Sequence, residues 1–205
     1  MKEQFVQLIR AIHRRGWAPA TGGNYSVVLN DEPLRLLMSP SGIDKGSITE
    51  SQLLVVDHEG NVVEGTGSAS AETQLHLAIV RMYGARSVIH THSIWNTLAS
   101  LNGDAFLIEG LEMLKALSGN TTHEHMEWVP IIDNSQDMAA LSDRLEKVHQ
   151  EYPLAHGILL RGHGLYTWGR TMEEANRHVE ALEFLFEILG RSSAVSNAQS
   201  AALAC

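Results

Sequence analysis

Two histidines separated by one residue, at the end of an apolar segment, constrain this chain more than any other feature. The segment covers residues 87–92, and Val88 and Ile89 predict a buried strand that leads into His90 and His92. Side chains alternate between the two faces of a strand, so the two imidazoles point to the same side. A pair placed in this way can bind one metal ion.

A third histidine follows a second apolar segment. His163 lies between Gly162 and Gly164, directly after residues 157–161. Glycine has no Cβ, which lets backbone and ligand approach closely. Three neutral imidazoles around a divalent ion leave a coordination position open, as is typical of catalytic metal sites. We therefore predict a metal site formed by His90, His92 and His163.

On its own, the histidine pair is better interpreted as two packed imidazoles. His163 and the loops described below reverse this interpretation and favour metal binding. His123 and His125 have the same spacing but lie in a polar stretch without a flanking strand. We interpret them as part of a surface loop. Cys205 is the single cysteine of the chain, so no internal disulfide and no thiolate ligand are expected.

Composition narrows the class of protein further. The chain has 205 residues, 44% of them hydrophobic, and a formal net charge of −9. This length suits one domain, which we place at residues 1–190, with residues 191–205 as a flexible C-terminal tail. The negative charge argues against nucleic-acid binding. Without an apolar run of about 18 residues or a signal peptide, we expect no membrane association and a cytoplasmic protein.

Periodicity and turn residues predict alternating helices and short strands. Short strands joined by tight turns favour antiparallel pairing, and several helices must then cover the sheet. The predicted fold is α/β, with a mostly antiparallel sheet between helices. Predicted helices cover residues 3–15, 72–83 with Ser70 as N-cap, 134–149 and 171–189; predicted strands cover 24–29, 34–39, 53–57, 62–64, 87–92, 128–132, 155–161 and 165–168.

Four motifs in this order resemble the class II aldolase and adducin family. They are Gly23-Asn24-Tyr25-Ser26, Ser39-Pro40-Ser41-Gly42, His90-Thr91-His92 and His163-Gly164. Each motif is weak alone, and their combination over residues 20–170 is specific. The resemblance implies a three-layer α/β/α sandwich, one zinc ion per subunit, and a homotetramer with active sites near subunit boundaries.

The resemblance also implies a sugar-phosphate substrate and two candidate acid/base residues. Similarity to the dehydratases of the family, strongest around residues 110–115 and 161–169, assigns the acid/base role to Glu112. Glu72 matches the position at which the sugar-phosphate aldolases carry their acid/base glutamate. Either carboxylate could instead be an ordinary residue at the start of a helix. The segments around Glu112 favour dehydration over aldol cleavage.

The phosphate group of such a substrate needs a concave array of donors. Loops rich in glycine and serine bind dianions through backbone amides. We expect the loops around Gly22 and Gly42 to provide these amides. The predicted phosphate-binding residues are Gly23, Asn24, Ser41, Gly42, Lys45 and Ser70. A non-catalytic interaction module resembling the adducin head is the alternative from another class, and the presence of all three histidines argues against it.

Overall fold

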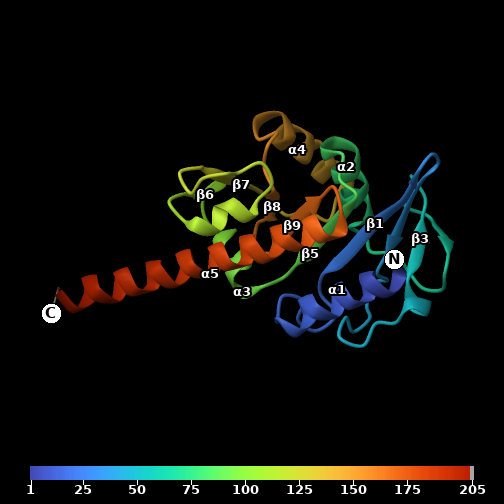
Figure 1. The fold of residues 1–205 in the computed structure, drawn as a ribbon, viewed down its shortest axis with the longest axis horizontal. Helices are drawn as coiled ribbons and strands as arrows, with labels where there is room; N and C mark the ends of the chain where they lie inside the picture. The colour runs from blue at the N-terminus through green and yellow to red at the C-terminus, as the bar shows by residue number, and fades with distance from the viewer. Residues whose placement is uncertain (204–205) are drawn as a thin grey trace.

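The described strands form one nine-stranded sheet (Figure 1). The computed structural model describes residues 1–203 and, within them, all side chains except those of residue 139 and residues 194–203. The strand order is β4-β3-β2-β1-β5-β9-β8-β7-β6, and each neighbouring pair is antiparallel except β7 and β8. The strands are β1 (Asn24–Asp31), β2 (Leu34–Met38), β3 (Leu54–Val56), β4 (Val62–Glu64), β5 (Ser87–Thr91), β6 (Ala105–Ile108), β7 (Glu127–Ile132), β8 (Gly157–Leu160) and β9 (Gly164–Gly169).

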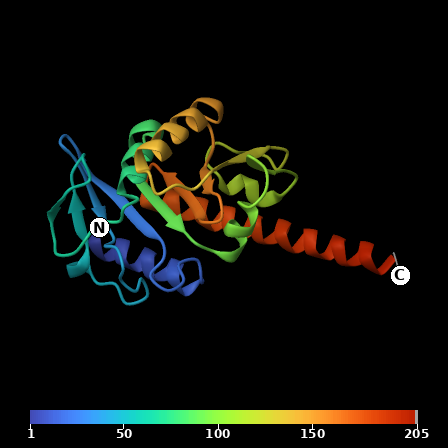
Figure 2. The same cartoon turned by 180° about the vertical axis from the view of Figure 1, so that it is seen from behind.

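Helices cover both faces of this sheet. The helices are α1 (Lys2–Arg14), α2 (Thr73–Tyr83), α3 (Ile94–Ala99), α4 (Met138–Glu151) and α5 (Met172–Leu203), with 3-10 turns η1 (Glu50–Gln52) and η2 (Glu112–Ala116). One apolar core joins α1 and α5 to the face that carries Ile89, and another joins α2 and α4 to the face that carries Val88. Helix α5 crosses in front of β5 and β9 in Figure 1 and lies behind them in Figure 2. The predicted three-layer α/β/α architecture is confirmed.

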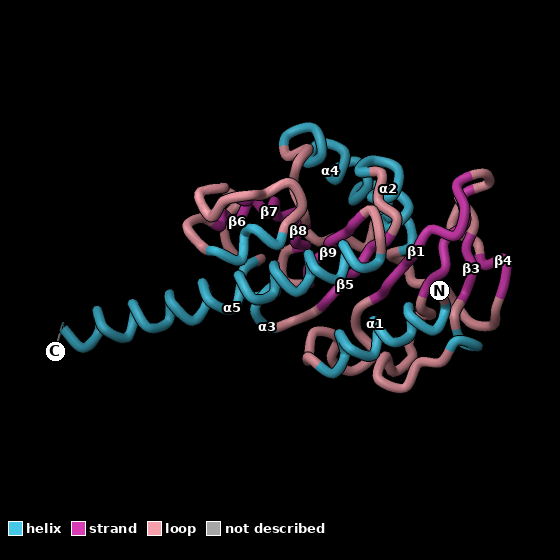
Figure 3. The backbone as a smooth tube through the Cα atoms, in the orientation of Figure 1, coloured by secondary structure: helices cyan, strands magenta, loops and turns pink. Residues whose placement is uncertain are grey.

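The last helix is longer than the sequence predicted. We expected a helix over residues 171–189, whereas α5 continues to Leu203 and its end projects from the body of the molecule (Figure 3). Gly190 does not end the helix. A Cβ at this position would lie 2.7 Å from Trp95, so the glycine lets α5 pass close to α3. The following alanine-rich segment has no proline to stop it. Flexibility of residues 191–205 stays a prediction, and residues 204–205 lie outside the described chain.

Three further local differences arise near helix ends and at a sheet edge. Helix α4 begins at Met138 and not at residue 134, because the Asp137 carboxylate accepts a hydrogen bond from the Ala140 amide at 3.1 Å and caps the helix there. Ser70 does not cap α2; its hydroxyl accepts from the Glu72 amide at 3.2 Å, in the turn before the helix. The edge strand β6 was not predicted, because a four-residue apolar run carries no distinctive period.

Candidate metal centre

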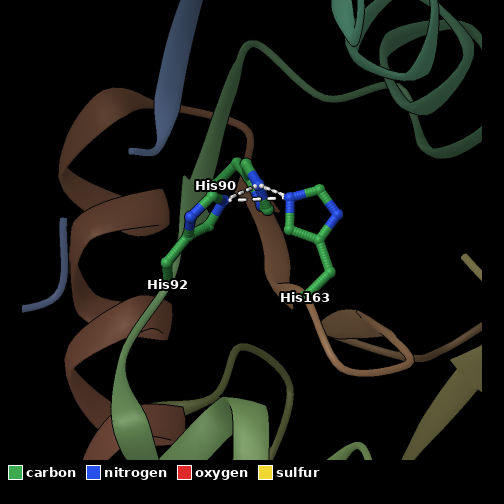
Figure 4. A group of neighbouring side chains, drawn as sticks. All are labelled: His90, His92 and His163. Carbon is green, nitrogen blue, oxygen red and sulfur yellow. Dashed lines mark hydrogen bonds between the residues drawn. The ribbon is translucent and has the colours of Figure 1, made fainter. Parts of the chain in front are cut away.

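The three predicted ligands come together at one end of the sheet. His90 is the second-last residue of the buried strand β5, His92 follows that strand, and His163 lies in the turn between β8 and β9. Figure 4 shows the three rings converging on one point. The Nε2 atoms of His90 and His92 are 2.7 Å apart, those of His92 and His163 are 3.0 Å apart, and those of His90 and His163 are 3.3 Å apart. Among the described residues, these histidines form the one group able to hold a metal ion.

The protonation of the triad fits a divalent cation. His90 Nδ1 lies 2.9 Å from the Leu165 carbonyl oxygen, which can only accept, so the ring proton is on Nδ1 and the Nε2 lone pair faces the other two histidines. Burial lowers the pKa of His90 well below its usual range, and burial with the neighbouring His163 lowers the pKa of His92 to about 4. Neutral imidazoles are the form that binds metals, and their converging lone pairs need a cation.

Close packing of the two strands holds His90 in place. A Cβ at Gly164 would collide with the Thr91 carbonyl oxygen and lie 3.1 Å from His90 Cε1, so β9 can approach the ligands only with glycine there. The predicted reason for the glycines around His163 is confirmed at this position. Tyr166, on the same strand as Gly164, stacks on His90 with ring centroids 3.9 Å apart and an interplanar angle of 15°. His90 therefore has little rotational freedom.

Glu72 is the carboxylate that the fold places beside the triad. Its Oε1 lies 3.2 Å from His163 Nε2, and its Oε2 lies 3.6 Å from His90 Nε2. The side chain is 17% exposed, which leaves it reachable from the adjoining cavity. The Asn24 side-chain amide donates to Oε2 at 2.5 Å. Glu72 is thus a fixed acceptor next to the metal position.

His76 orients Asn24, a role that the sequence did not reveal. His76 Nε2 donates to Asn24 Oδ1 at 2.5 Å, and the Ser26 hydroxyl donates to His76 Nδ1 at 2.8 Å. This arrangement leaves the Asn24 amide group free to point at Glu72. Burial lowers the pKa of His76 to about 3, so the ring stays neutral. The sequence offered one signal, the position of His76 one helical turn after Glu72.

A cavity of about 240 Å³ adjoins the histidines and brings all six predicted phosphate-binding residues together. Lys45 is 1% exposed, and its Nζ donates to the carbonyl oxygens of Thr21 and Ile43, each at 3.1 Å. The cavity is lined by Gly23, Asn24, Ser41, Gly42, Lys45, Ser70, Glu72, His92 and His163, among others.

Two of the backbone amides that we expected near the phosphate have other partners. The Gly22 amide donates to the Pro19 carbonyl oxygen at 3.0 Å, and the Ser41 amide donates to the Ser68 carbonyl oxygen at 2.9 Å. The Ser70 hydroxyl accepts from the Glu72 amide and, at 3.4 Å, from the Asn24 side chain, which leaves its proton for a ligand. Side-chain donors therefore contribute more to this cavity than the loop pattern suggested.

One wall of the cavity was not predicted at all. It comes from the loop before α4 and from the first turns of that helix. The residues are Asn134, Ser135, Gln136, Met138 and Leu141. The sequence placed residues 134–137 inside a helix, so no signal marked them as binding residues. Met138 and Leu141 give this wall an apolar portion.

Glu112 lies elsewhere. It begins η2, its side chain is 72% exposed, and it does not line the cavity at the histidines. Its carboxylate accepts from Lys115 Nζ at 2.6 Å and lies 3.7 Å from His123 Nδ1. The hydrogen bond from Lys115 lowers the pKa of Glu112. The other histidine of that loop, His125, lies 3.2 Å from the Glu127 carboxylate.

Comparison with known proteins agrees with this architecture. Residues 3–189 match the model of the Class II Aldolase and Adducin N-terminal domain. A methylthioribulose-1-phosphate dehydratase of Serratia proteamaculans (strain 568) is 44% identical over 191 residues, covering 90% of this chain and 93% of that protein. A protein of the same name from Pseudomonas aeruginosa (strain LESB58) is 43% identical over 190 residues, covering 91% of this chain and 92% of that protein.

Solved structures show the same fold. L-fuculose-1-phosphate aldolase from Thermus thermophilus superposes with a TM-score of 0.77 at 24% identity, covering 96% of this chain and 99% of that one. YgbL from Escherichia coli, a putative aldolase/epimerase/decarboxylase, gives a TM-score of 0.75 at 25% identity, covering 91% of this chain and 86% of that one. The chain belongs to the class II aldolase and adducin family. Of the helices described here, none has the length and apolarity to cross a membrane.

Proposed function

We propose that this chain is a zinc-dependent dehydratase of methionine salvage, which converts 5-methylthioribulose 1-phosphate to 5-methylthio-2,3-dioxopentyl phosphate and water. The main support is the 44% identity over 90% of the chain to a protein named methylthioribulose-1-phosphate dehydratase. The cavity supports the same conclusion, because two of the three converging imidazoles, His92 and His163, line it together with a carboxylate and a buried ammonium group.

The dehydration needs a proton acceptor at C3 and a proton donor at the departing C4 hydroxyl. His90, His92 and His163 would hold the zinc ion, which acts as a Lewis acid on substrate oxygens. A carboxylate removes the C3 proton and delivers it to the C4 hydroxyl, so that water leaves and the carbon chain stays intact; the enol left at C3 then tautomerises to the 2,3-diketone. Glu72, held by Asn24, is the carboxylate of the same chain in position for one of these transfers.

The two ends of the substrate differ in chemistry, and so do the walls of the cavity. Lys45 and the Ser70 hydroxyl offer a charged and a neutral donor for the phosphate. Burial lowers the pKa of Lys45, and a bound dianion would favour its charged form. Met138 and Leu141 offer an apolar surface for the methylthio group.

Glu112 fits the proposed reaction if the chain works as a homotetramer. Its carboxylate is exposed, and next to it lies an apolar hollow of about 570 Å³ formed by η2 and α5, with Leu111, Met113 and Phe184 among its lining residues. In this arrangement Glu112 of one subunit reaches the cavity of a neighbouring subunit and shares the acid/base work with Glu72. The tetramer, like a cytoplasmic location, is inferred from the family resemblance.

The deciding experiment is product analysis of the zinc-loaded protein incubated with 5-methylthioribulose 1-phosphate. The expected product has lost one water and keeps the carbon chain. Dihydroxyacetone phosphate would instead identify a class II aldolase, since aldol cleavage breaks the C3–C4 bond. Unchanged substrate under conditions in which zinc is bound would remove the dehydratase proposal and leave a non-catalytic module of the adducin type. A preparation stripped of zinc is the matched control.

A further inference from the structure

His90 and His92, at the end of β5, have a support on the opposite face of the sheet. Thr91, the residue between them, points to the α5 side, where its hydroxyl donates to Glu183 Oε1 at 2.8 Å. Glu183 lies in the middle of α5 and is 2% exposed. A carboxylate buried to this degree is costly unless several donors solvate it.

The side chains that donate to Glu183 come from the segment that begins between His90 and His92 and runs into the first turn of α3. Besides Thr91, the Ser93 hydroxyl donates to Oε2 at 2.5 Å, and the Asn96 side-chain amide donates to Oε1 at 2.9 Å. Ser93 directly follows His92 and caps α3 by accepting from the Asn96 amide at 3.0 Å. Glu183 thereby fixes both the end of β5 and the first turn of α3.

The same short helix holds the third ligand. The Thr97 hydroxyl of α3 donates to the Ser93 carbonyl oxygen at 2.7 Å and also lies 3.3 Å from the His163 carbonyl oxygen. At the end of α3, the Ser100 hydroxyl accepts from the Gly162 amide at 2.8 Å. A continuous chain of hydrogen bonds therefore runs from Glu183 through α3 to the turn that carries His163.

We propose that Glu183 is a positioning residue for the metal centre: it aligns His90 and His92 through Thr91 and Ser93, and His163 through α3, and so sets the affinity for the metal. This inference rests on the proposed metal binding by the three histidines. Outer partners of metal ligands commonly contribute about 10- to 100-fold to metal affinity. Glu183 touches none of the imidazoles and acts through the backbone that carries them.

The test measures zinc affinity of the folded protein by competition with a chromophoric chelator. Glu183→Ala leaves the donors of Thr91, Ser93 and Asn96 without their acceptor, and zinc affinity should fall about 10- to 100-fold. Glu183→Gln keeps the shape and an acceptor oxygen for Thr91 and Asn96, so it should recover part of this loss. Glu187→Gln is the matched control, because Glu187 lies one turn further along α5 and pairs with Arg191 near the surface. It should bind zinc like the wild type.

Thermal unfolding with and without zinc separates positioning from plain stabilisation. A purely structural role would lower the stability of the zinc-free and zinc-loaded protein equally. A positioning role lowers the stabilisation that zinc adds, by about 1.4 kcal/mol for each tenfold loss of affinity. Folded Glu183→Ala that binds zinc within twofold of the wild type would overturn the proposal.

Thr91→Val keeps the test valid if Glu183→Ala does not fold. The substitution removes one donor while preserving the size and strand preference of the side chain. We expect at least a threefold loss of zinc affinity, and little further loss when Thr91→Val is added to Glu183→Gln. Unchanged affinity in both Thr91→Val and Glu183→Gln would reject the role of Glu183. Wild-type protein that fails to bind zinc would reject the metal site itself, which is a different result.

Discussion

The two glutamates predicted as acid/base residues lie in opposite surroundings. Glu72 is 17% exposed, 3.2 Å from the His163 imidazole, and fixed by a hydrogen bond from Asn24. Glu112 is 72% exposed and pairs with Lys115 on the surface. Glu72 is thus a group that one chain can position by itself, whereas Glu112 needs a neighbouring chain to reach a cavity. Folding of a single chain is enough to place Glu72 beside the three histidines, whereas it leaves Glu112 on the surface.

The largest expected difference between the region of Glu72 and the region of Glu112 is the effect of removing a histidine on zinc affinity. His163→Ala removes one of three ligands, and the zinc affinity should fall by more than about 100-fold, since even outer partners of ligands contribute 10- to 100-fold. His123→Ala, beside Glu112, should leave the zinc affinity unchanged. Chelator competition on both variants measures the contrast. Equal losses would mean that the metal binds outside the converging triad.

The next largest effect is expected at Glu72. In Glu72→Gln the shape is kept and the proton acceptor is lost, so the turnover number should fall about 10²- to 10⁴-fold while zinc stays bound. Glu59→Gln, which changes an exposed carboxylate of the β3–β4 turn, is the matched control. Turnover is measured by loss of substrate, and zinc by metal analysis of the same samples. A variant with more than a third of the wild-type turnover would exclude Glu72 as the base.

The role of Glu112 is tested by mixing subunits. Glu112→Gln alone should also lose turnover, although its carboxylate lies outside the cavity of its own chain. If it acts on a neighbouring subunit, mixed tetramers of Glu112→Gln and Glu72→Gln contain some cavities with both carboxylates intact. Random mixing gives roughly a quarter of the wild-type activity. If both glutamates act within one chain, each subunit is defective and mixing restores nothing.

The sequence grouped the three candidate metal ligands correctly because two local rules were sufficient. The alternation of side chains along residues 87–92 put His90 and His92 on one face, and the glycines around His163 marked a close approach of strands, which Gly164 shows in the fold. Helix and strand types followed from periodicity in most segments. These features depend on a few neighbouring residues, which a sequence displays directly.

The supports of the site could not be predicted, because they depend on which elements pack together. His76 and Glu183 are ordinary helix positions until α2 places one next to Asn24 and α5 places the other behind Thr91. The cavity wall at residues 134–137 was hidden by a helix predicted to begin too early. The surroundings of Glu112 could not be predicted either, because periodicity cannot show whether a short turn faces a cavity or solvent.

The smallest expected effect concerns the attachment of the Glu112 region to the rest of the fold. His178 of α5 accepts from the Ser118 amide, just after η2, at 3.1 Å through Nε2, and donates to the Trp168 carbonyl oxygen at 2.7 Å through Nδ1. The ring is 3% exposed, and burial lowers its pKa to about 4. The neutral ring therefore ties the segment after η2 to α5 and β9.

Acid should weaken this attachment. Between the ordinary pKa of histidine, about 6.5, and the folded value near 4, the unfolded chain binds a proton at His178 that the folded chain does not. The free energy of unfolding contributed by this group therefore falls as the pH falls, by up to about 1.4 kcal/mol per pH unit. Denaturant unfolding of zinc-free wild type and His178→Gln measures it. The variant should show the shallower loss of stability between pH 6.5 and 4, although His76, His90 and His92 keep a slope in both proteins. Parallel slopes would mean that the bonds of His178 do not hold the Glu112 region in place.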